Sequence, residues 1–423
     1  MSLQQGQEIE LVAEKAASGG RMIARHDGEV VLLSGAIPGE RVRARVTRAE
    51  KRLAFAETTA VLEPSADRRE AADASCGGCL YAFIRYERQL LLKADIVRDA
   101  FTRIGKIPLE QDVDVAASPE TGYRVRARFH VRDGQPGFYR EGTHVLCDPR
   151  QTGQLTDASI EAVEATLAAM KAQGHAVAAL ELSENLAADQ RAVHLDLRDA
   201  NPSSDALGRA VVAGGLTGCT ARALDTTFYS AGDPIVADPL TALTGGRAPE
   251  GFLQRHPESF FQANRFLLAR LVTAVLDAAP PGKVLDLYAG VGLFAVAFAA
   301  TGRGRIIAVE GDPVSGRDLQ RNAAPYYEQL RVSRNSVEAY LAGRSGSVDT
   351  IVVDPPRTGM SKEAAEAIAR FGAGRIVYVS CDAPTMARDA RRLLDAGYRL
   401  ESLRAFDLFP NTPHVETLGV FGR

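Results

Sequence analysis

The spacing of apolar positions changes character along the chain. Between residues 8 and 60, short apolar–polar alternations are broken at Gly19-Gly20, Asp27-Gly28 and Pro38-Gly39, a pattern typical of short strands joined by turns. From about residue 256, strand-length apolar bursts alternate with helical stretches. The first pattern predicts a small OB-like β-barrel, and the second predicts a parallel sheet flanked by helices.

The region between these two parts contains both helix-like and strand-like patterns. Residues 61–75 are polar and contain Pro64, which is typical of a linker, and residues 81–105 carry apolar side chains at helical spacing. We predict a long helix there, ending at Gly105 and packing on the C-terminal domain. Residues 123–146 predict a hairpin. The predicted protein is α/β, with a barrel over 1–62, an α+β central domain over 63–250 and a Rossmann-like domain over 251–423.

Composition narrows the classes of protein. The 423 residues carry a net charge of −3, so nucleic-acid contacts would have to come from local basic patches. The sequence has no run of 18 apolar residues, and its first residues do not resemble a signal peptide. Five cysteines fit a reducing compartment. We therefore expect a cytoplasmic protein, monomeric and without a membrane partner.

Two stretches alternate arginine with apolar residues. Arg41, Arg43 and Arg45 share one face of a predicted barrel strand, and "YRVRARF" repeats the pattern at Arg124, Arg126 and Arg128. Such a face is either an ordinary solvated strand surface or a set of contacts for RNA phosphates. The pattern alone leaves both interpretations open.

Acids and glycines follow the predicted strands of the last third. "VLDLYAGVGLF" places Gly290 and Gly292 in a tight turn, without the spacing of a dinucleotide or ATP loop. About 20 residues later Glu310 closes a strand, where a carboxylate can accept hydrogen bonds from a ribose diol. "VVDPPRTGM" places Asp354 at a third strand end, ahead of two prolines that stiffen the loop. These strand ends predict a ligand site.

Cys381 lies between a buried strand, "RIVYVS", and a helix for which Asp382 is the predicted N-cap and Pro384 lies in the first turn. A lone cysteine is more often core filler than a nucleophile. The helix dipole at this position favours a thiolate, however, so we expect a lowered pKa and a nucleophilic sulfur. Glu416, near the end of the chain, is a candidate general base or a plain strand acid.

Together these segments resemble the S-adenosylmethionine-dependent RNA (uracil-5-)-methyltransferases, most closely the 23S rRNA enzymes that carry a TRAM domain. The resemblance rests on "GAIPGERV", "CGGC", "FFQAN", "DLYAGVGLF", "DPPRTGM", "VSCDAPTMARD" and "HVET". It implies a methyl donor, S-adenosylmethionine, held by Gln262, Tyr288, Gly290, Glu310 and Asp354. It also implies RNA as substrate, Cys381 as nucleophile at carbon 6 of uracil, and Glu416 as the base that removes the carbon-5 proton, yielding 5-methyluridine.

The chain departs from the family at three points. Ser336 and Leu293 stand where cofactor-contacting polar or acidic side chains are common. The family often holds a [4Fe–4S] cluster on four cysteines, and this chain offers Cys76, Cys79 and, out of register, Cys147. The cluster therefore stays an open alternative, as do a transfer RNA T-loop substrate and a non-catalytic RNA-binding role.

Overall fold

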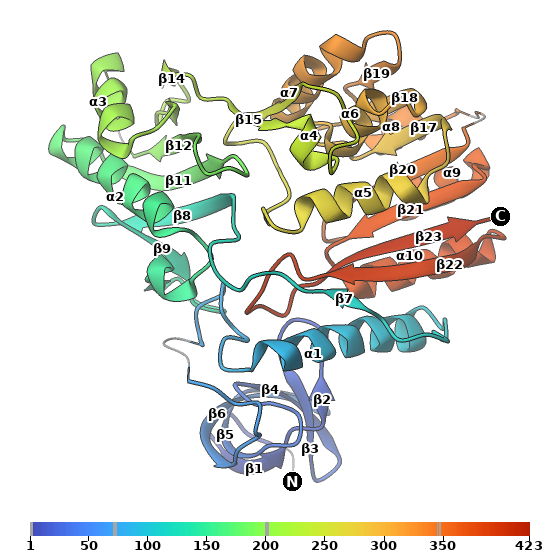
Figure 1. The fold of residues 1–423 in the computed structure, drawn as a ribbon. Helices are drawn as coiled ribbons and strands as arrows, with labels where there is room; N and C mark the ends of the chain where they lie inside the picture. The colour runs from blue at the N-terminus through green and yellow to red at the C-terminus, as the bar shows by residue number, and fades with distance from the viewer. Residues whose placement is uncertain (1–2, 71–73, 199–202, 345, 347) are drawn as a thin grey trace.

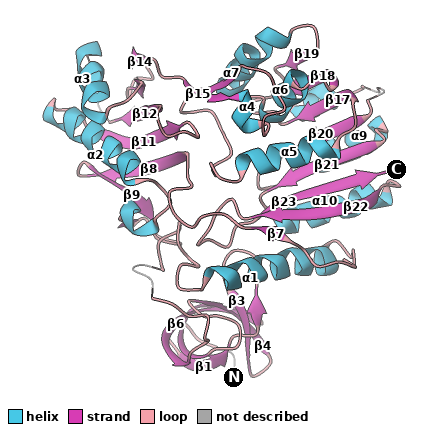
Figure 2. Ribbon diagram, viewed as in Figure 1, coloured by secondary structure: helices cyan, strands magenta, loops and turns pink. Residues whose placement is uncertain are grey.

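The computed structural model describes residues 3–70, 74–198, 203–344, 346 and 348–423. Its largest element is an eight-stranded sheet in the C-terminal third (Figures 1 and 2). The strand order is β19 (Leu330–Ser333), β18 (Gly304–Val309), β17 (Gly282–Leu287), β20 (Thr350–Val353), β21 (Arg375–Ser380), β23 (Glu416–Gly422), β22 (Arg399–Phe406) and β7 (Val115–Ala116). Strands β19 to β21 are parallel, and β23 runs antiparallel to both of its neighbours.

Helices cover both faces of this sheet, because its strands are apolar on both sides. One core packs the sheet against α5 (Leu268–Ala278), α6 (Leu293–Ala300) and α7 (Pro313–Ala323). The other packs it against α8 (Val337–Leu341), α9 (Lys362–Phe371) and α10 (Ala383–Asp395). The predicted Rossmann-like α/β architecture is confirmed, although β19, β22 and β7 were not among the predicted strands.

The predicted helix over 81–105 is shorter at its start. Residues 81–83 form a turn and Ile84 forms a β-bridge with Arg68. Helix α1 begins at Tyr86 and runs to Asp99, and a π-helical turn covers Ala100–Ile104 before Gly105. The turns persist because the Gln89 amide, near the helix start, donates to the carbonyl oxygens of Tyr81 and Ile84. Further along, Val97 and Phe101 pack into the core beside α10, so α1 joins the C-terminal sheet to the barrel (Figure 1).

The N-terminal barrel contains six strands in the order β1 (Glu8–Val12), β5 (Arg41–Glu50), β6 (Leu53–Glu63), β4 (Glu29–Ser34), β3 (Met22–His26) and β2 (Lys15–Ala16). Its alternating arginines lie beside acids on the neighbouring strands. Arg41 pairs with Glu10 at 2.7 Å and with Glu63 at 3.3 Å, and Arg45 pairs with Glu8 at 3.1 Å. On this face the structure therefore favours cross-strand ion pairs over free phosphate contacts.

The central region holds a seven-stranded sheet in the order β10 (Leu146–Cys147), β9 (Gln135–Tyr139), β8 (Arg126–Arg132), β11 (Val177–Glu184), β12 (Arg191–Leu197), β13 (Gly218–Arg222) and β14 (Phe228–Gly232). The helices α2 (Asp157–Ala172) and α3 (Ser204–Gly214) cover one face. The predicted hairpin is β8–β9. A short ribbon, β15 (Val236–Pro239) and β16 (Phe252–Arg255), with α4 (Leu240–Leu243), leads into the C-terminal sheet, and the turns η2 (Pro149–Thr152) and η3 (Ala324–Tyr326) complete the described elements. None of the helices in the described ranges has the length and apolar character that a membrane crossing requires.

Candidate active site

Two neighbouring antiparallel strands bring Cys381 and Glu416 together. The last paired residues of β21 and β23 are Ser380 and Thr417, so the next position in register sets Cys381 opposite Glu416. Cys381 then leads directly into α10, whose N-cap is Asp382, as predicted; the Asp382 carboxylate accepts a hydrogen bond from the Thr385 amide at 2.9 Å. The sulfur and the carboxyl group thus share one edge of the sheet.

Asp354 reaches the same edge from the parallel neighbour, since it follows β20 directly. Its Oδ2 accepts a hydrogen bond of 3.0 Å from the side-chain amide of Gln262, which is buried. Gln262 belongs to a segment bound to the central sheet, where the Val125 amide donates to the Ala263 carbonyl oxygen at 2.8 Å. This edge of the sheet is therefore completed by Gln262, from a segment that is hydrogen-bonded to the central region.

The pKa of Cys381 differs from the sequence expectation. Burial, with the carboxyl groups of Glu416, Asp354 and Asp382, raises the pKa of its thiol to about 12. The prediction of a lowered pKa considered only the dipole of α10. It left out the charge of the adjacent Asp382 and the two acids, Glu416 and Asp354, that only the fold brings to the sulfur. In the protein without RNA, Cys381 is a neutral thiol.

Asp354 and Glu416 are also shifted toward their neutral forms. Burial raises the pKa of Asp354 to about 7, against the opposing hydrogen bond from Gln262. The pKa of Glu416 rises well above its usual value through burial and through the neighbouring Asp354. Carboxyl groups held close to neutrality in this way are suited to accept and return protons at physiological pH.

Two basic side chains at this edge, Arg357 and His414, were given no catalytic role in the sequence analysis. The charge of Arg357, from the "DPPRTGM" loop, lowers the pKa of both Cys381 and Glu416. Burial, with the charges of Arg357, Lys93 and Arg124, lowers the pKa of His414 to about 4. The signal available in the sequence was position: Arg357 lies three residues after Asp354, and His414 lies two before Glu416.

The glycine turn forms as predicted, with φ of 61° at Tyr288, 57° at Gly290 and 96° at Gly292. The Glu310 carboxylate stabilises it, because Oε2 accepts a hydrogen bond from the Gly290 amide at 2.7 Å. Oε1 accepts one from the Asp312 amide at 2.6 Å. Each oxygen keeps a second lone pair for a hydroxyl group.

Tyr288, another residue of the predicted cofactor set, lies at the start of the glycine turn. Its side chain lines a cavity of about 400 Å³ together with Glu338, Pro356 and Met360. Burial raises its pKa, and the acids Glu338 and Asp389 raise it further.

Two of the positions where this chain departs from the family have structural roles. Ser336 is the N-cap of α8, and its hydroxyl accepts a hydrogen bond from the Ala339 amide. Leu293 packs in the core under the sheet.

The edge fits S-adenosylmethionine. A Cβ atom built on Gly290 would meet nothing within 4 Å, so there is open space over the turn. In the part of the chain that the structure describes, both carboxyl oxygens of Glu416 are buried and lack a hydrogen-bond partner. Buried oxygens without a hydrogen-bond partner are typical of a site that receives its polar partners from a ligand.

Three cysteines meet outside this edge. Cys76 and Cys147 form a disulfide across a separation of 71 residues, and Cys79 lies in the same buried cluster. The remaining two cysteines lie elsewhere, Cys219 in β13 and Cys381 at the edge. A [4Fe–4S] cluster needs four thiolates, so these residues do not fit one. Among the described residues we find no group of three or more His, Cys, Asp or Glu side chains that could hold a metal ion.

Comparison with known proteins agrees with this arrangement. Residues 249–422 match the family described as tRNA (Uracil-5-)-methyltransferase, and residues 2–59 match the TRAM domain. An uncharacterized RNA methyltransferase of Streptomyces coelicolor is 33% identical, over 98% of this chain and 93% of that protein. The 23S rRNA (uracil(1939)-C(5))-methyltransferase RlmD of Pseudomonas entomophila is 31% identical, over 98% of this chain and 94% of that protein.

A solved structure shares the whole fold. The tRNA (uracil-54, C5)-methyltransferase of Pyrococcus abyssi, in complex with S-adenosyl-L-homocysteine, superposes with a TM-score of 0.77 at 23% identity. The match covers 97% of this chain and 99% of that one. Full-length relatives at 30% identity or more, a matching catalytic family and a matching fold lead to one conclusion: the chain belongs to the family of S-adenosylmethionine-dependent RNA (uracil-5-)-methyltransferases.

Proposed function

We propose that the protein methylates carbon 5 of one uridine in 23S rRNA through a covalent adduct with Cys381. The observation that carries this proposal is the register of β21 and β23, which sets a thiol opposite a buried carboxyl group at the ligand-binding edge of the sheet. The ribosomal substrate is proposed from relatives named for it, RlmD of two Pseudomonas species.

The proposed nucleophilic step explains the need for a thiol. Carbon 5 of uracil is a weak nucleophile, so Cys381 first loses its proton to water and its sulfur bonds to carbon 6. The electron pair of the 5,6 double bond then moves into an enolate spanning carbon 5 and oxygen 4. Arg357 is the cation that favours the thiolate form of Cys381, because its charge lowers the thiol pKa while three carboxyl groups raise it. S-adenosylmethionine, when bound, supplies the electrophilic methyl group to carbon 5.

Glu416 acts in the second half of the proposed reaction. Its carboxylate removes the proton from carbon 5, the released pair restores the 5,6 double bond, and the bond from carbon 6 to sulfur breaks to return the Cys381 thiolate. The raised pKa of Glu416 makes its ionised form a stronger base than a solvent-exposed glutamate. In this proposal the methyl donor is held by Gln262, Tyr288, Gly290, Glu310 and Asp354, with Asp354 shared between the two ligands.

Replacement of the nucleophile tests the mechanism. Cys381→Ala should abolish methyl transfer to RNA while affinity for RNA and for S-adenosylhomocysteine is retained. Cys219→Ala, which removes a sulfur from the central sheet, is the matched control and should stay active. RNA containing 5-fluorouridine should form a stable adduct with the native chain, because fluorine at carbon 5 cannot leave as a proton. A Cys381→Ala variant that still methylates would exclude this mechanism.

The substrate is tested in cells. Mapping 5-methyluridine in ribosomal and transfer RNA from a deletion strain should show loss at one position of 23S rRNA. Loss in transfer RNA alone would instead favour a T-loop enzyme, the activity named for the structural relative from Pyrococcus abyssi. Unchanged 5-methyluridine in both RNAs, together with an intact affinity for RNA, would favour the non-catalytic role.

A further inference from the structure

The two sets of alternating arginines differ in what surrounds them. On barrel strand β5, arginines and acids are about equally exposed: 49% against 42% for Arg41 and Glu10, and 59% against 51% for Arg45 and Glu8. An RNA phosphate approaching this face meets as many carboxylates as guanidinium groups, so the face offers little net attraction.

The central sheet arranges its charges differently. Its face opposite α2 and α3 carries Arg128, which is 51% exposed over Glu181 at 11% and Asp196 at 29%. On β13, Arg222 is 40% exposed over Glu258 at 13%. The carboxylates lie beneath and orient the guanidinium groups, which stay outermost. Arginines held in this way lose little conformational entropy when they bind a phosphate.

Aromatic rings lie among these arginines. The rings of His130 and Tyr139 stack at 3.9 Å across β8 and β9. On the opposite edge strand, Phe228 is 55% exposed, and the Arg222 guanidinium lies 5.0 Å from its ring centroid. Aromatic rings interleaved with arginine are the features on which single-stranded nucleic acid stacks, and Phe228 is the exposed ring of these three. A solvated antiparallel sheet face does not by itself require them.

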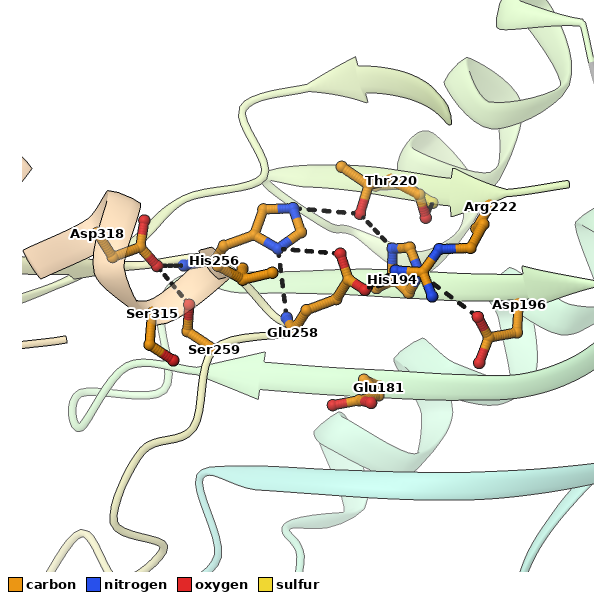
Figure 3. Close-up of polar contacts among 12 residues, drawn as sticks. Glu181, His194, Asp196, Thr220, Arg222, His256, Glu258, Ser259, Ser315 and Asp318 are labelled. Atoms are coloured by element: carbon orange, nitrogen blue, oxygen red, sulfur yellow. Dashed lines mark hydrogen bonds and ion pairs between the residues drawn. The ribbon is translucent and has the colours of Figure 1, made fainter. Parts of the chain in front are cut away.

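Polar contacts join this surface to the C-terminal domain. Polar contacts run from Asp196 and Arg222 through His194 and Glu258 to His256, and the His256 amide donates to Asp318 of α7 at 2.7 Å (Figure 3). At the other end, β8 follows directly on the segment that pairs with Ala263 beside Gln262. Strands β9 to β14 are five spacings apart, a width of about 24 Å at ~4.8 Å each.

We propose that this surface, the arginine face (Arg128, His130, Arg132, Tyr139, Arg222 and Phe228), binds single-stranded RNA that flanks the target uridine. Guanidinium groups contact phosphates, and the rings on β8, β9 and the edge strand β14 stack on bases. The arginines of β5 do not make such contacts. The link to a target uridine rests on the proposed function, whereas RNA binding by the arginine face does not.

The test compares charge-matched variants of the full-length protein. The probe is a short fluorescein-labelled poly(U) RNA, titrated between about 50 and 200 mM KCl. Arg128→Gln with Arg132→Gln removes two charges from the arginine face, yet Glu181 keeps Arg126 and Asp196 keeps His194 as partners. Arg43→Gln with Arg45→Gln removes two charges from β5. Unchanged affinity for S-adenosylhomocysteine verifies that each variant is folded.

The two double variants should behave differently. Loss of two phosphate contacts lowers the slope of log affinity against log salt by about 1.4 for the arginine-face variant, with no change for the β5 variant. Phe228→Ala should weaken binding about 5- to 100-fold through the lost stack, whereas Tyr327→Ala, at another exposed ring, should not.

Two results would overturn the proposal. One is an equal or larger change in the β5 variant, and the other is unchanged RNA affinity in the arginine-face variants, which would indicate a different partner for this surface. Neither result depends on methylation, and binding can be measured equally in a Cys381→Ala background. Failure of the arginine-face proposal is therefore distinguishable from failure of the proposed reaction.

Discussion

Neutralising one buried carboxyl group should stabilise this protein in a pH-dependent way. Asp354→Asn keeps the size of the side chain and an oxygen that accepts the Gln262 hydrogen bond, so the change is confined to the charge. In the native chain, burial raises the pKa of Asp354 from 3.8 to about 7. The ionised carboxylate is thus less favourable in the folded state than in the unfolded chain.

The sign and the size of the stability change in Asp354→Asn follow from the difference between the folded and unfolded pKa of Asp354. Because the folded-state pKa is the higher one, the contribution of Asp354 to stability is fully present below pH ~4 and is lost as pH rises through 7. A difference of about three pKa units at 1.36 kcal/mol each corresponds to about 4 kcal/mol. Asp354→Asn should therefore be more stable than the native chain by roughly that amount at pH 8, and by little at pH 4.

Urea titrations followed by circular dichroism between pH 4 and 8 measure this difference. Asp395→Asn, which removes an exposed carboxylate paired with Arg391 on α10, is the control and should change stability little at any pH. Asp354→Asn should also lose methyl transfer, because a site that keeps an unfavourable buried charge for its function gives up stability for activity. An Asp354→Asn variant that is no more stable at pH 8 than at pH 4, relative to the native chain, would refute the reasoning.

Two further predictions concern the base and the disulfide. Glu416→Gln cannot remove the carbon-5 proton, so an RNA–protein adduct should accumulate on denaturing gels; rapid turnover without an adduct would contradict the role of Glu416 as base. Cys147→Ser removes the disulfide with Cys76, which closes a separation of 71 residues. The loop-closure entropy of such a disulfide contributes about 4 kcal/mol to the free energy of unfolding. The variant should melt below the native chain without reductant and together with it in excess reductant, whereas identical melting in both conditions would argue against the disulfide.

Much of the C-terminal fold could be predicted from short segments of the sequence. Apolar bursts ending in glycine, acid or proline predicted β17, β18, β20 and β21, because strand length, turn chemistry and helix caps depend on neighbouring residues. The capping of α10 by Asp382 and the tight turn at Gly290 were predicted for the same reason and are confirmed. The start of α1 was misplaced, since the turns before it are held partly by Asn411, far along the chain.

The site could be predicted only in part. Sequence motifs singled out Cys381, Glu416, Asp354 and Gln262, and their roles in catalysis and cofactor binding stay predictions for the experiments above. The direction of the Cys381 pKa was predicted wrongly, because its value depends on carboxyl groups from three separate strand ends and on burial. Arg357 entered the site only once the loop after β20 was placed in space.

The sequence by itself determined the order and type of the main elements and the residues that carry the family resemblance. The tertiary structure alone decided which charges face each other. It paired the arginines of β5 with equally exposed acids, set those of the central sheet above buried ones, and joined Cys76 to Cys147. The physical reason is range: helix caps and turns act over a few residues, whereas desolvation and Coulomb interactions depend on groups that only folding brings together.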